Sequence, residues 1–531
     1  MATEAPPARD RLRGLRNAVP EGAGVESWVL SGVIGLYCWL LAPATSDLAA
    51  AVFRSDVFDQ GALIYNAQWY DGHHLVAYSL LSPPLGALLG TRLLGALCTL
   101  GATIAFERIV VPRHGTAGRV AAVLFALTLG SSLLIGRIAF AVGFFFGVLA
   151  VYFAVRERYL AACAAAVLAA LGSPLAGLFL AMLAGAWLIV SRRAWALALA
   201  VCAVAPSLVL QFAFREGGTF PYGWVSFGQL LVLVALFALT LPRSERLLWV
   251  AVVLYLVLGI YAQAVPSQLG GNVNRLGTIV GAPLMALVLW NRRRFLLLFA
   301  LPYLLWWPIH SVLRDLPNAG GAITESAYYE PLNDWLERNT DGPIRIEIPP
   351  TRNHWEGVYV GERFQLARGW ERQLDQKYDA LYYGTVITPA RYRRWLVRNA
   401  VQYVALSNAP TDFAARSEAD LLVQEPLPYL ELVWQNRDWK LWQVQKPARL
   451  LSGPGRLTDA TPDSFTIQAD RPGRFVMRLH FSPYWKLVEG SGCVRVGARN
   501  WTEVRLERPG RAVVRESFSP IRVLSQGPRC S

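Results

Sequence analysis

The chain has 531 residues, of which 54% are hydrophobic and only 17% are charged, and its formal net charge is +14. Soluble domains carry about 25% charged residues, so this composition excludes a chain made only of soluble domains. The charged residues are sparse before residue 310 and frequent after it. We therefore expect a membrane unit of roughly 300 residues followed by one or two smaller soluble domains. Much of the basic charge lies between apolar runs, where it orients helices in a membrane, so no nucleic-acid partner is predicted.

A series of apolar runs separated by short polar connections fills residues 27–309. A transmembrane helix needs about 20 mainly apolar residues, and about eleven runs approach that length. The two runs around Gly172-Ser173-Pro174 are short, so a helical hairpin there is the alternative to two full spans. The predicted spans are 28–45, 92–110, 120–136, 139–155, 159–171, 174–190, 195–212, 225–241, 247–263, 275–290 and 295–309.

Arginine is distributed unequally between alternate connections. Sixteen arginines lie in one set, which includes the predicted cytoplasmic tail 1–26, and five lie in the other set. Because positive charge is enriched on the cytoplasmic side, we expect a plasma-membrane protein whose N-terminus is cytoplasmic. An odd number of spans would then place the C-terminal part on the extracytoplasmic side. The five outer arginines either lie among lipid headgroups or bind phosphate through their planar guanidinium groups. They are Arg54, Arg92, Arg137, Arg215 and Arg275.

The longest outer connection of the membrane unit covers residues 46–91. Asp47 directly follows the first predicted span, and Arg54 lies two helical turns later on the same face of a helix. Asp47 is predicted either to cap the N-terminus of that helix or to act as a catalytic base at the membrane edge. Asp56 follows and is a second candidate acid, while Phe53 and Phe58 are expected to lie on the membrane surface.

Asp71, His73 and His74 lie later in the same outer loop. Two adjacent histidines cannot easily ligate one ion together, so no metal site is predicted. Asp71 could add a ligand, which leaves a divalent cation as an optional cofactor. Otherwise these three side chains are candidates for contacting a sugar or an acceptor.

The pattern after residue 310 changes to mixed α/β, and we expect an outer α/β domain over residues 310–447. Trp355 and Glu356 belong to a polar and aromatic segment that is predicted either to bind a sugar or to pack over the membrane unit. Thr388 is expected to cap a helix that begins with a proline. The expected helices are 327–338 and 389–398, and the expected strands are 344–348, 401–406, 429–434 and 439–444.

Residues 448–531 contain short runs typical of strands, separated by Pro-Gly turns, and are predicted to form a small β-sandwich. Its expected strands include 465–468, 474–481, 493–496 and 512–516. Trp485 and Trp501 are predicted either to bind carbohydrate or to pack in the core or at an edge. Cys493 and Cys530 could form a disulfide in an oxidising exterior.

These features together resemble the GT-C superfamily of polytopic membrane glycosyltransferases, which use polyprenyl-phosphate-linked sugars on the outer face of the membrane. The resemblance is carried by Asp47 at the start of the first outer loop, by Pro83-Pro84-Leu85, by Arg92 at the start of the second span, and by Arg275 followed by Pro283. Leu48 stands where the superfamily usually has a second acidic residue. Segments 136–140 and 270–275 are similar to those of an uncharacterised branch from high-GC bacteria.

The resemblance implies an inverting transfer of a sugar to a cell-envelope glycan or lipid. It implies that Asp47 is the catalytic base, with Asp56 as a second catalytic candidate, and that the donor phosphate is bound by arginines, for which the candidates are Arg54, Arg92, Arg137 and Arg275. Two other functions stay open on the sequence. One is a multi-span transporter or flippase, and the other is a non-catalytic envelope-assembly protein of the same fold.

Overall fold

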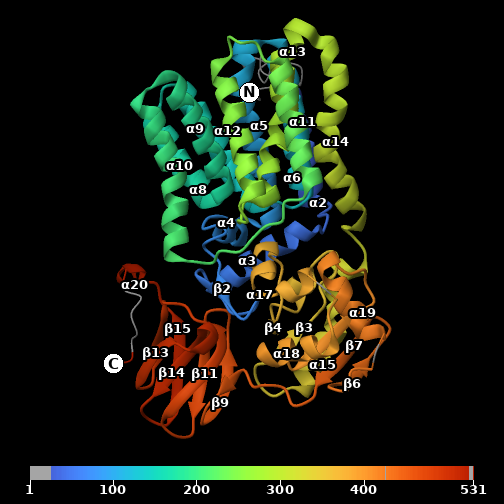
Figure 1. Cartoon of the computed structure of the whole chain (residues 1–531), viewed down its shortest axis with the longest axis vertical. Helices are drawn as coiled ribbons and strands as arrows, with labels where there is room; N and C mark the ends of the chain where they lie inside the picture. Colours follow the sequence, from blue (N-terminus) through green and yellow to red (C-terminus); the bar gives the residue numbers. More distant parts are fainter. Residues whose placement is uncertain (1–24, 385, 425, 525–529, 531) are drawn as a thin grey trace, which may run out of the picture.

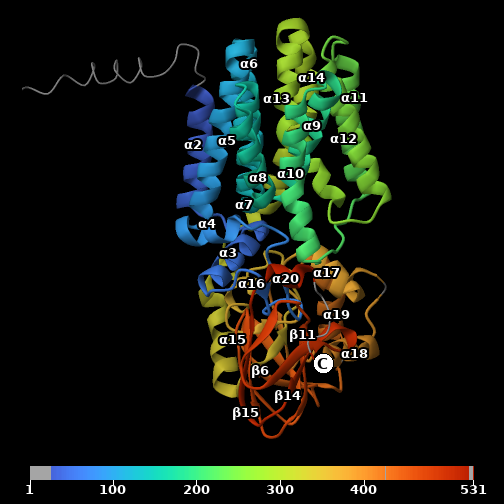
Figure 2. The ribbon, with the colours of Figure 1, turned by 90° about the vertical axis from the view of Figure 1, so that its left-hand side faces the viewer.

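The computed structural model describes residues 25–384, 386–424, 426–524 and 530, so the predicted tail 1–26 lies almost wholly outside the described residues. The molecule is elongated, with a helical bundle at one end and two β-containing outer units at the other (Figure 1). The same division is visible after a quarter turn (Figure 2). Short helices of the first outer loop lie between the bundle and the outer units.

The helical bundle contains one helix at the position of each predicted span. Its helices are α2 (Val25–Leu40), α5 (Thr91–His114), α6 (Thr116–Leu134), α7 (Ile138–Val155), α8 (Tyr159–Gly172), α9 (Pro174–Ser191), α10 (Ala194–Ala213), α11 (Trp224–Thr240), α12 (Arg246–Ala264), α13 (Asn274–Arg293) and α14 (Leu297–Asp315). Seven stretches are long and apolar enough to cross a membrane, one of them being the continuous segment Gly270–Asn318. Helices α2, α8 and α11 are apolar but shorter. The structure is thus compatible with a membrane protein, while the count of eleven spans stays a prediction.

Successive helices of the bundle run in alternating directions, so alternate connections lie at the same end (Figure 1). The arginine-rich connections 113–119, 156–158, 192–193, 243–246 and 292–294 lie at the end remote from the outer units. Loops 46–91 and 214–223 lie at the end that faces those units.

The first outer loop folds into α3 (Ser46–Asp59), the two-residue strands β1 (Tyr65–Asn66) and β2 (His73–His74), and α4 (Ser82–Leu89). This loop is largely buried beneath the outer units. The ring of Phe53 is fully buried and stacks on Trp69 with the centroids 3.9 Å apart. The expectation that Phe53 lies on the membrane surface is therefore wrong, because the outer α/β unit covers that face of α3.

The outer α/β unit is built on a mixed sheet in the order β4-β3-β5-β7-β6. Strands β3, β4 and β5 are parallel, and β5, β7 and β6 are antiparallel. Thr388 caps α18 by accepting a hydrogen bond from the backbone N–H of Arg391, which confirms the predicted cap. The strands are β3 (Arg345–Glu347), β4 (Gln365–Leu366), β5 (Tyr403–Ser407), β6 (Leu430–Gln435) and β7 (Trp439–Val444), and the helices are α15 (Ser326–Asn339), α16 (Glu356–Tyr359), α17 (Arg372–Tyr378), α18 (Pro389–Arg398) and α19 (Arg416–Gln424).

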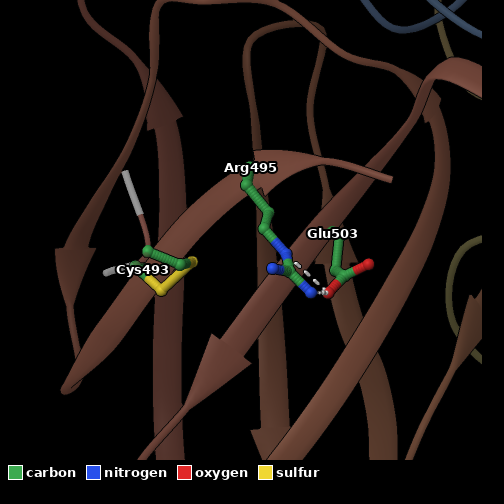
Figure 3. The surroundings of a disulfide bond; sticks show 4 residues. Cys493, Arg495 and Glu503 are labelled. Atoms are coloured by element: carbon green, nitrogen blue, oxygen red, sulfur yellow. Dashed lines mark hydrogen bonds and ion pairs between the residues drawn. A yellow bond between two sulfur atoms is a disulfide. The ribbon is translucent and has the colours of Figure 1, made fainter. Parts of the chain in front are cut away.

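The C-terminal unit is a sandwich of two four-stranded antiparallel sheets, in the orders β12-β15-β10-β9 and β13-β14-β11-β8. Trp485 is fully buried in the core of this sandwich, so of its two predicted roles the structure supports core packing. Cys493 and Cys530 form a disulfide beside the Arg495–Glu503 ion pair (Figure 3). The strands are β8 (Leu451–Ser452), β9 (Gly455–Ala460), β10 (Ser464–Ala469), β11 (Gly473–His480), β12 (Trp485–Glu489), β13 (Gly492–Val496), β14 (Trp501–Leu506) and β15 (Gly510–Glu516), and the short helix α20 (Pro520–Leu524) follows.

Candidate functional site

A cavity of about 570 Å³ lies where the helical bundle meets the outer α/β unit. One wall comes from the first turns of α3 and from the starts of α7 and α13. The opposite wall comes from residues 352–354, 370–373 and 410–416 of the outer unit. The cavity therefore combines residues of the helical bundle and of α3 with residues of the outer α/β unit.

Charged side chains dominate this cavity, with seven arginines and four carboxylates among its lining residues. Each carboxylate is paired with one arginine: Asp47 with Arg137 at 3.2 Å, Glu371 with Arg54 at 2.5 Å, Asp315 with Arg314 at 2.9 Å, and Asp412 with Arg372 at 2.9 Å. Among the described residues, no carboxylate lies within 4.0 Å of the guanidinium groups of Arg275, Arg352 and Arg416. The cavity thus has three positive charges that its own carboxylates do not balance, which suits an anionic ligand.

Asp47 lies in the first turn of α3, and the N-cap residue of that helix is Thr45. The capping alternative for Asp47 is therefore wrong, and its carboxylate instead faces the cavity. The side chain is 31% exposed, and one of its oxygens accepts a hydrogen bond from Arg137 Nε. Thr45 anchors the start of α3 by donating a hydrogen bond from its hydroxyl to the backbone carbonyl of Ile135, at 2.7 Å.

Gly136 allows the turn before α7 to approach α3 closely. Its φ of +90° lies in the region that favours glycine, and a Cβ atom there would lie 2.5 Å from the backbone nitrogen of Leu48. Gly136 precedes Arg137, and Leu48 follows Asp47. The absence of a side chain at residue 136 therefore sets the distance between the two charged groups.

Arg54 and Arg275 complete the cavity wall that comes from α3 and the helical bundle. Arg54 is nearly fully buried and lies over the ring of Tyr78 at 4.0 Å, besides its ion pair with Glu371. Arg275 is in the first turn of α13 and lies 5.7 Å from the centroid of the Phe140 ring. Arg275 also lines a second cavity of about 270 Å³ that shares several lining residues with the first and extends between the ends of α7, α9 and α10.

An aromatic and charged cluster forms the outer-unit wall. The ring of His354 stacks on Trp370 with the centroids 3.4 Å apart and lies 3.6 Å from both Asp412 and Glu356. Burial alone would lower the pKa of His354, but the adjacent carboxylates of Asp412 and Glu356 outweigh it and raise the pKa. Asp412 has its pKa lowered well below its usual range, because the adjacent His354 and the two hydrogen bonds from Arg372 outweigh its desolvation.

Four of the predicted site residues line the cavity, namely Asp47, Arg54, Arg137 and Arg275. Asp56 and Arg92 do not line it. Asp56 instead faces Glu362. Burial is the main cause that raises the pKa of Asp56 to about 7, and the neighbouring carboxyl group of Glu362 raises it further.

Asp71 and His74 hold the first outer loop against other units, whereas His73 is buried against Trp69 and Tyr70 of the same loop. Asp71 forms a buried ion pair with Arg345 at 2.6 Å. Burial lowers the pKa of His73 to about 4. His74 pairs with Glu216 at 2.6 Å, and its other ring nitrogen lies 3.0 Å from the Ser482 hydroxyl. His74 lines the second cavity, whereas Asp71 and His73 line neither of the two cavities described so far.

Trp355 and Glu356 are buried between the outer unit and the bundle. Trp355 donates from its indole nitrogen to the backbone carbonyl of Ala44 at 3.0 Å, and Glu356 accepts from the Thr351 hydroxyl at 2.6 Å. These contacts agree with the packing alternative for this segment. Across the described residues, no group of three or more His, Cys, Asp or Glu side chains is arranged to hold a metal ion.

Several cavity residues were not among the predicted site residues: Arg314, Arg352, Glu371, Arg372, Asp412 and Arg416. Arg352 lies three residues before Trp355, and Glu371 and Arg372 directly follow Trp370, so the polar and aromatic composition around them partly indicated a site. Asp412 and Arg416 have no such signal, because only the fold of the outer unit brings them to the cavity.

No protein-family model matches the chain, and no curated protein matches it.

Proposed function

We propose that the chain is a membrane glycosyltransferase of the GT-C type, which moves a sugar from a polyprenyl-phosphate donor to a cell-envelope glycan or lipid on the outer face. One observation carries the proposal: Asp47, Arg137 and Arg275, which are distant in sequence, line one cavity that has an excess of arginines. A carboxylate beside unbalanced guanidinium groups suits a reaction between a hydroxyl nucleophile and a phosphate leaving group.

The sidedness of the protein is part of the proposal. The arginine-rich connections lie at the end of the bundle remote from the outer units, which supports a cytoplasmic location for that end. The disulfide between Cys493 and Cys530 supports an oxidising compartment for the sandwich. Both observations are independent of the cavity and favour its opening on the extracytoplasmic side.

The proposed mechanism uses the charged groups in turn. The acceptor oxygen attacks the anomeric carbon and forms the new glycosidic bond, while Asp47 accepts the proton of that hydroxyl. The bond between the anomeric carbon and the phosphate oxygen breaks, and the lipid phosphate leaves with the electron pair. Arg275, Arg352 and Arg416, which have no ion-pair carboxylate among the described residues, stabilise that charge. Arg137 orients Asp47 through its 3.2 Å contact.

The test is complementation of a deletion strain, read out by linkage analysis of its envelope glycans. Asp47→Asn preserves shape and removes the proton acceptor, so the transfer rate should fall by about 100-fold or more at unchanged protein level in the membrane. Asp59→Asn is the matched control, because Asp59 is an exposed aspartate at the end of the same helix. Full complementation by Asp47→Asn would refute the assignment of the base.

A second variant tests the donor side of the cavity. Arg275→Gln removes a positive charge that has no carboxylate partner among the described residues, so donor use should fall by about 10-fold to 100-fold. The deletion strain should accumulate the polyprenyl-phosphate sugar on the outer leaflet. Accumulation on the inner leaflet would instead indicate a flippase.

A further inference from the structure

A cleft of about 1250 Å³ lies between the outer α/β unit and the sandwich. Its walls come from α18 and the end of α17 on one side and from β11 and the start of β14 on the other. Both outer units lie at the end of the molecule opposite the arginine-rich connections (Figure 1). This cleft is separate from the cavity that contains Asp47.

Six arginines make the cleft strongly basic. They are Arg391, Arg393, Arg394, Arg398, Arg478 and Arg499. Among the described residues, no ion pair joins a carboxylate to Arg393, Arg394, Arg398 or Arg499, and the first three of these are on one exposed surface of α18. A cluster of arginines that line one cleft without carboxylate partners among the described residues favours an anionic ligand.

The two carboxylates that line the cleft do not cancel this charge. Asp71 is already paired with the buried Arg345 at 2.6 Å. Asp379 is buried, that burial raises its pKa above the usual range, and its carboxylate already accepts a hydrogen bond from the indole nitrogen of Trp395 at 2.8 Å. Arg478 and Arg499 lie near one another, and burial together with that like charge lowers the pKa of Arg478. The cleft therefore has an excess of positive charge.

Three stacked rings form a short aromatic column in the cleft wall, with His480 between Tyr378 and Trp501. Tyr378 stacks on His480 with the centroids 4.4 Å apart and an interplanar angle of 22°. His480 in turn stacks on Trp501 at 5.2 Å and 18°. Burial lowers the pKa of His480 to about 4, so its ring is neutral at neutral pH. Uncharged aromatic faces pack well against the C–H faces of sugar rings.

We infer that this cleft binds an anionic carbohydrate chain, whose carboxylate or phosphate groups contact the arginines and whose sugar rings pack on Tyr378 and Trp501, the outer rings of the aromatic column. A basic groove with aromatic rings would also suit single-stranded nucleic acid. The disulfide in the sandwich favours an oxidising, extracytoplasmic compartment, where glycans are the common polyanions. The binding does not depend on the proposed transfer reaction, since none of these groups lines the cavity of Asp47.

The test measures binding by the full chain in lipid nanodiscs to four labelled probes. These are a galacturonate oligosaccharide, a phosphorylated mannose oligosaccharide, a neutral dextran oligosaccharide and a single-stranded oligodeoxynucleotide. At least one of the two acidic oligosaccharides should bind, with an affinity that decreases as the salt concentration rises. Comparison of the two shows whether the cleft prefers carboxylate or phosphate groups. Equal binding of dextran, tighter binding of the oligodeoxynucleotide, or binding of neither acidic probe would overturn the inference.

Two double variants complete the test. Arg394→Gln with Arg499→Gln should weaken binding of the acidic probe by about tenfold or more, because two charge-assisted contacts are lost. Arg437→Gln with Arg456→Gln removes the same charge from exposed positions outside the cleft and should leave the affinity unchanged. Equal losses in both pairs would show that net charge alone drives the binding and would refute the site. All four residues are exposed, so folding should be preserved, and equal Tm values check this.

Discussion

Gly136→Ala should separate the carboxylate of Asp47 from its arginine without changing any charged residue. An alanine at a φ of +90° costs about 1–3 kcal/mol, and its Cβ would lie 2.5 Å from the backbone nitrogen of Leu48. Relief of that overlap requires the start of α3 or the turn before α7 to move, so the 3.2 Å contact between Asp47 and Arg137 lengthens. A displacement of about 1 Å at a reacting group can cost about 100-fold in rate.

The assay measures glycan transfer in the complemented strain together with the Tm of the purified protein. Gly147→Ala is the control, since this glycine lies inside α7 with nothing within 4 Å of the added Cβ. Alanine is the better helix former by up to about 1 kcal/mol, so Gly147→Ala should keep transfer and Tm or raise Tm slightly. If Gly136→Ala retained both properties, the close approach would have no role in positioning Asp47.

Two further substitutions test buried charges outside the cavity. Asp71→Asn leaves Arg345 buried without its carboxylate and should destabilise the protein by about 3 kcal/mol, seen as a lower Tm; an unchanged Tm would contradict the importance of this ion pair. Asp56 has a folded pKa of about 7, above the ordinary value of 3.8, so its ionisation costs the folded state stability as pH rises through that interval. Asp56→Asn should therefore raise stability by about 1–2 kcal/mol near pH 8, a figure reduced for partial exposure, and the difference should vanish near pH 4. A gain of equal size at both pH values would exclude titration of Asp56 beside Glu362 as its cause.

The geometry of α3 explains which site residues could be predicted from the sequence. At about 100° per residue, Asp47 and Arg54 are separated by about 700°, which returns nearly to the same face, and both line the cavity. Asp56 is nine residues after Asp47, about 900° away, and therefore points to the opposite face. Helical periodicity alone thus argues against a shared site for the two aspartates.

The remaining cavity residues depend on tertiary structure that no local pattern encodes. Phe53 is apolar at helical spacing, which fits a membrane surface and a protein interface equally well, and only the outer unit decides between them. Asp412 and Arg416 reach the cavity because β3 and β5 are parallel neighbours in the sheet, so the segments that follow them lie at the same edge. The apolar runs, in contrast, are set by composition and length, and each predicted span coincides with a helix.

Helix α17 lies between the two proposed sites and makes their independence testable. At its start Arg372 pairs with Asp412 in the cavity of Asp47, and at its end Tyr378 stacks on His480 in the basic cleft. Asp47→Asn removes only a proton acceptor, so it should abolish transfer and leave binding of the acidic probe unchanged. The cleft variants should weaken that binding while a short neutral acceptor is still used at the normal rate. If Asp47→Asn also weakened binding, the ligand would have to extend past α17 into the cavity, and the two sites would act on one molecule.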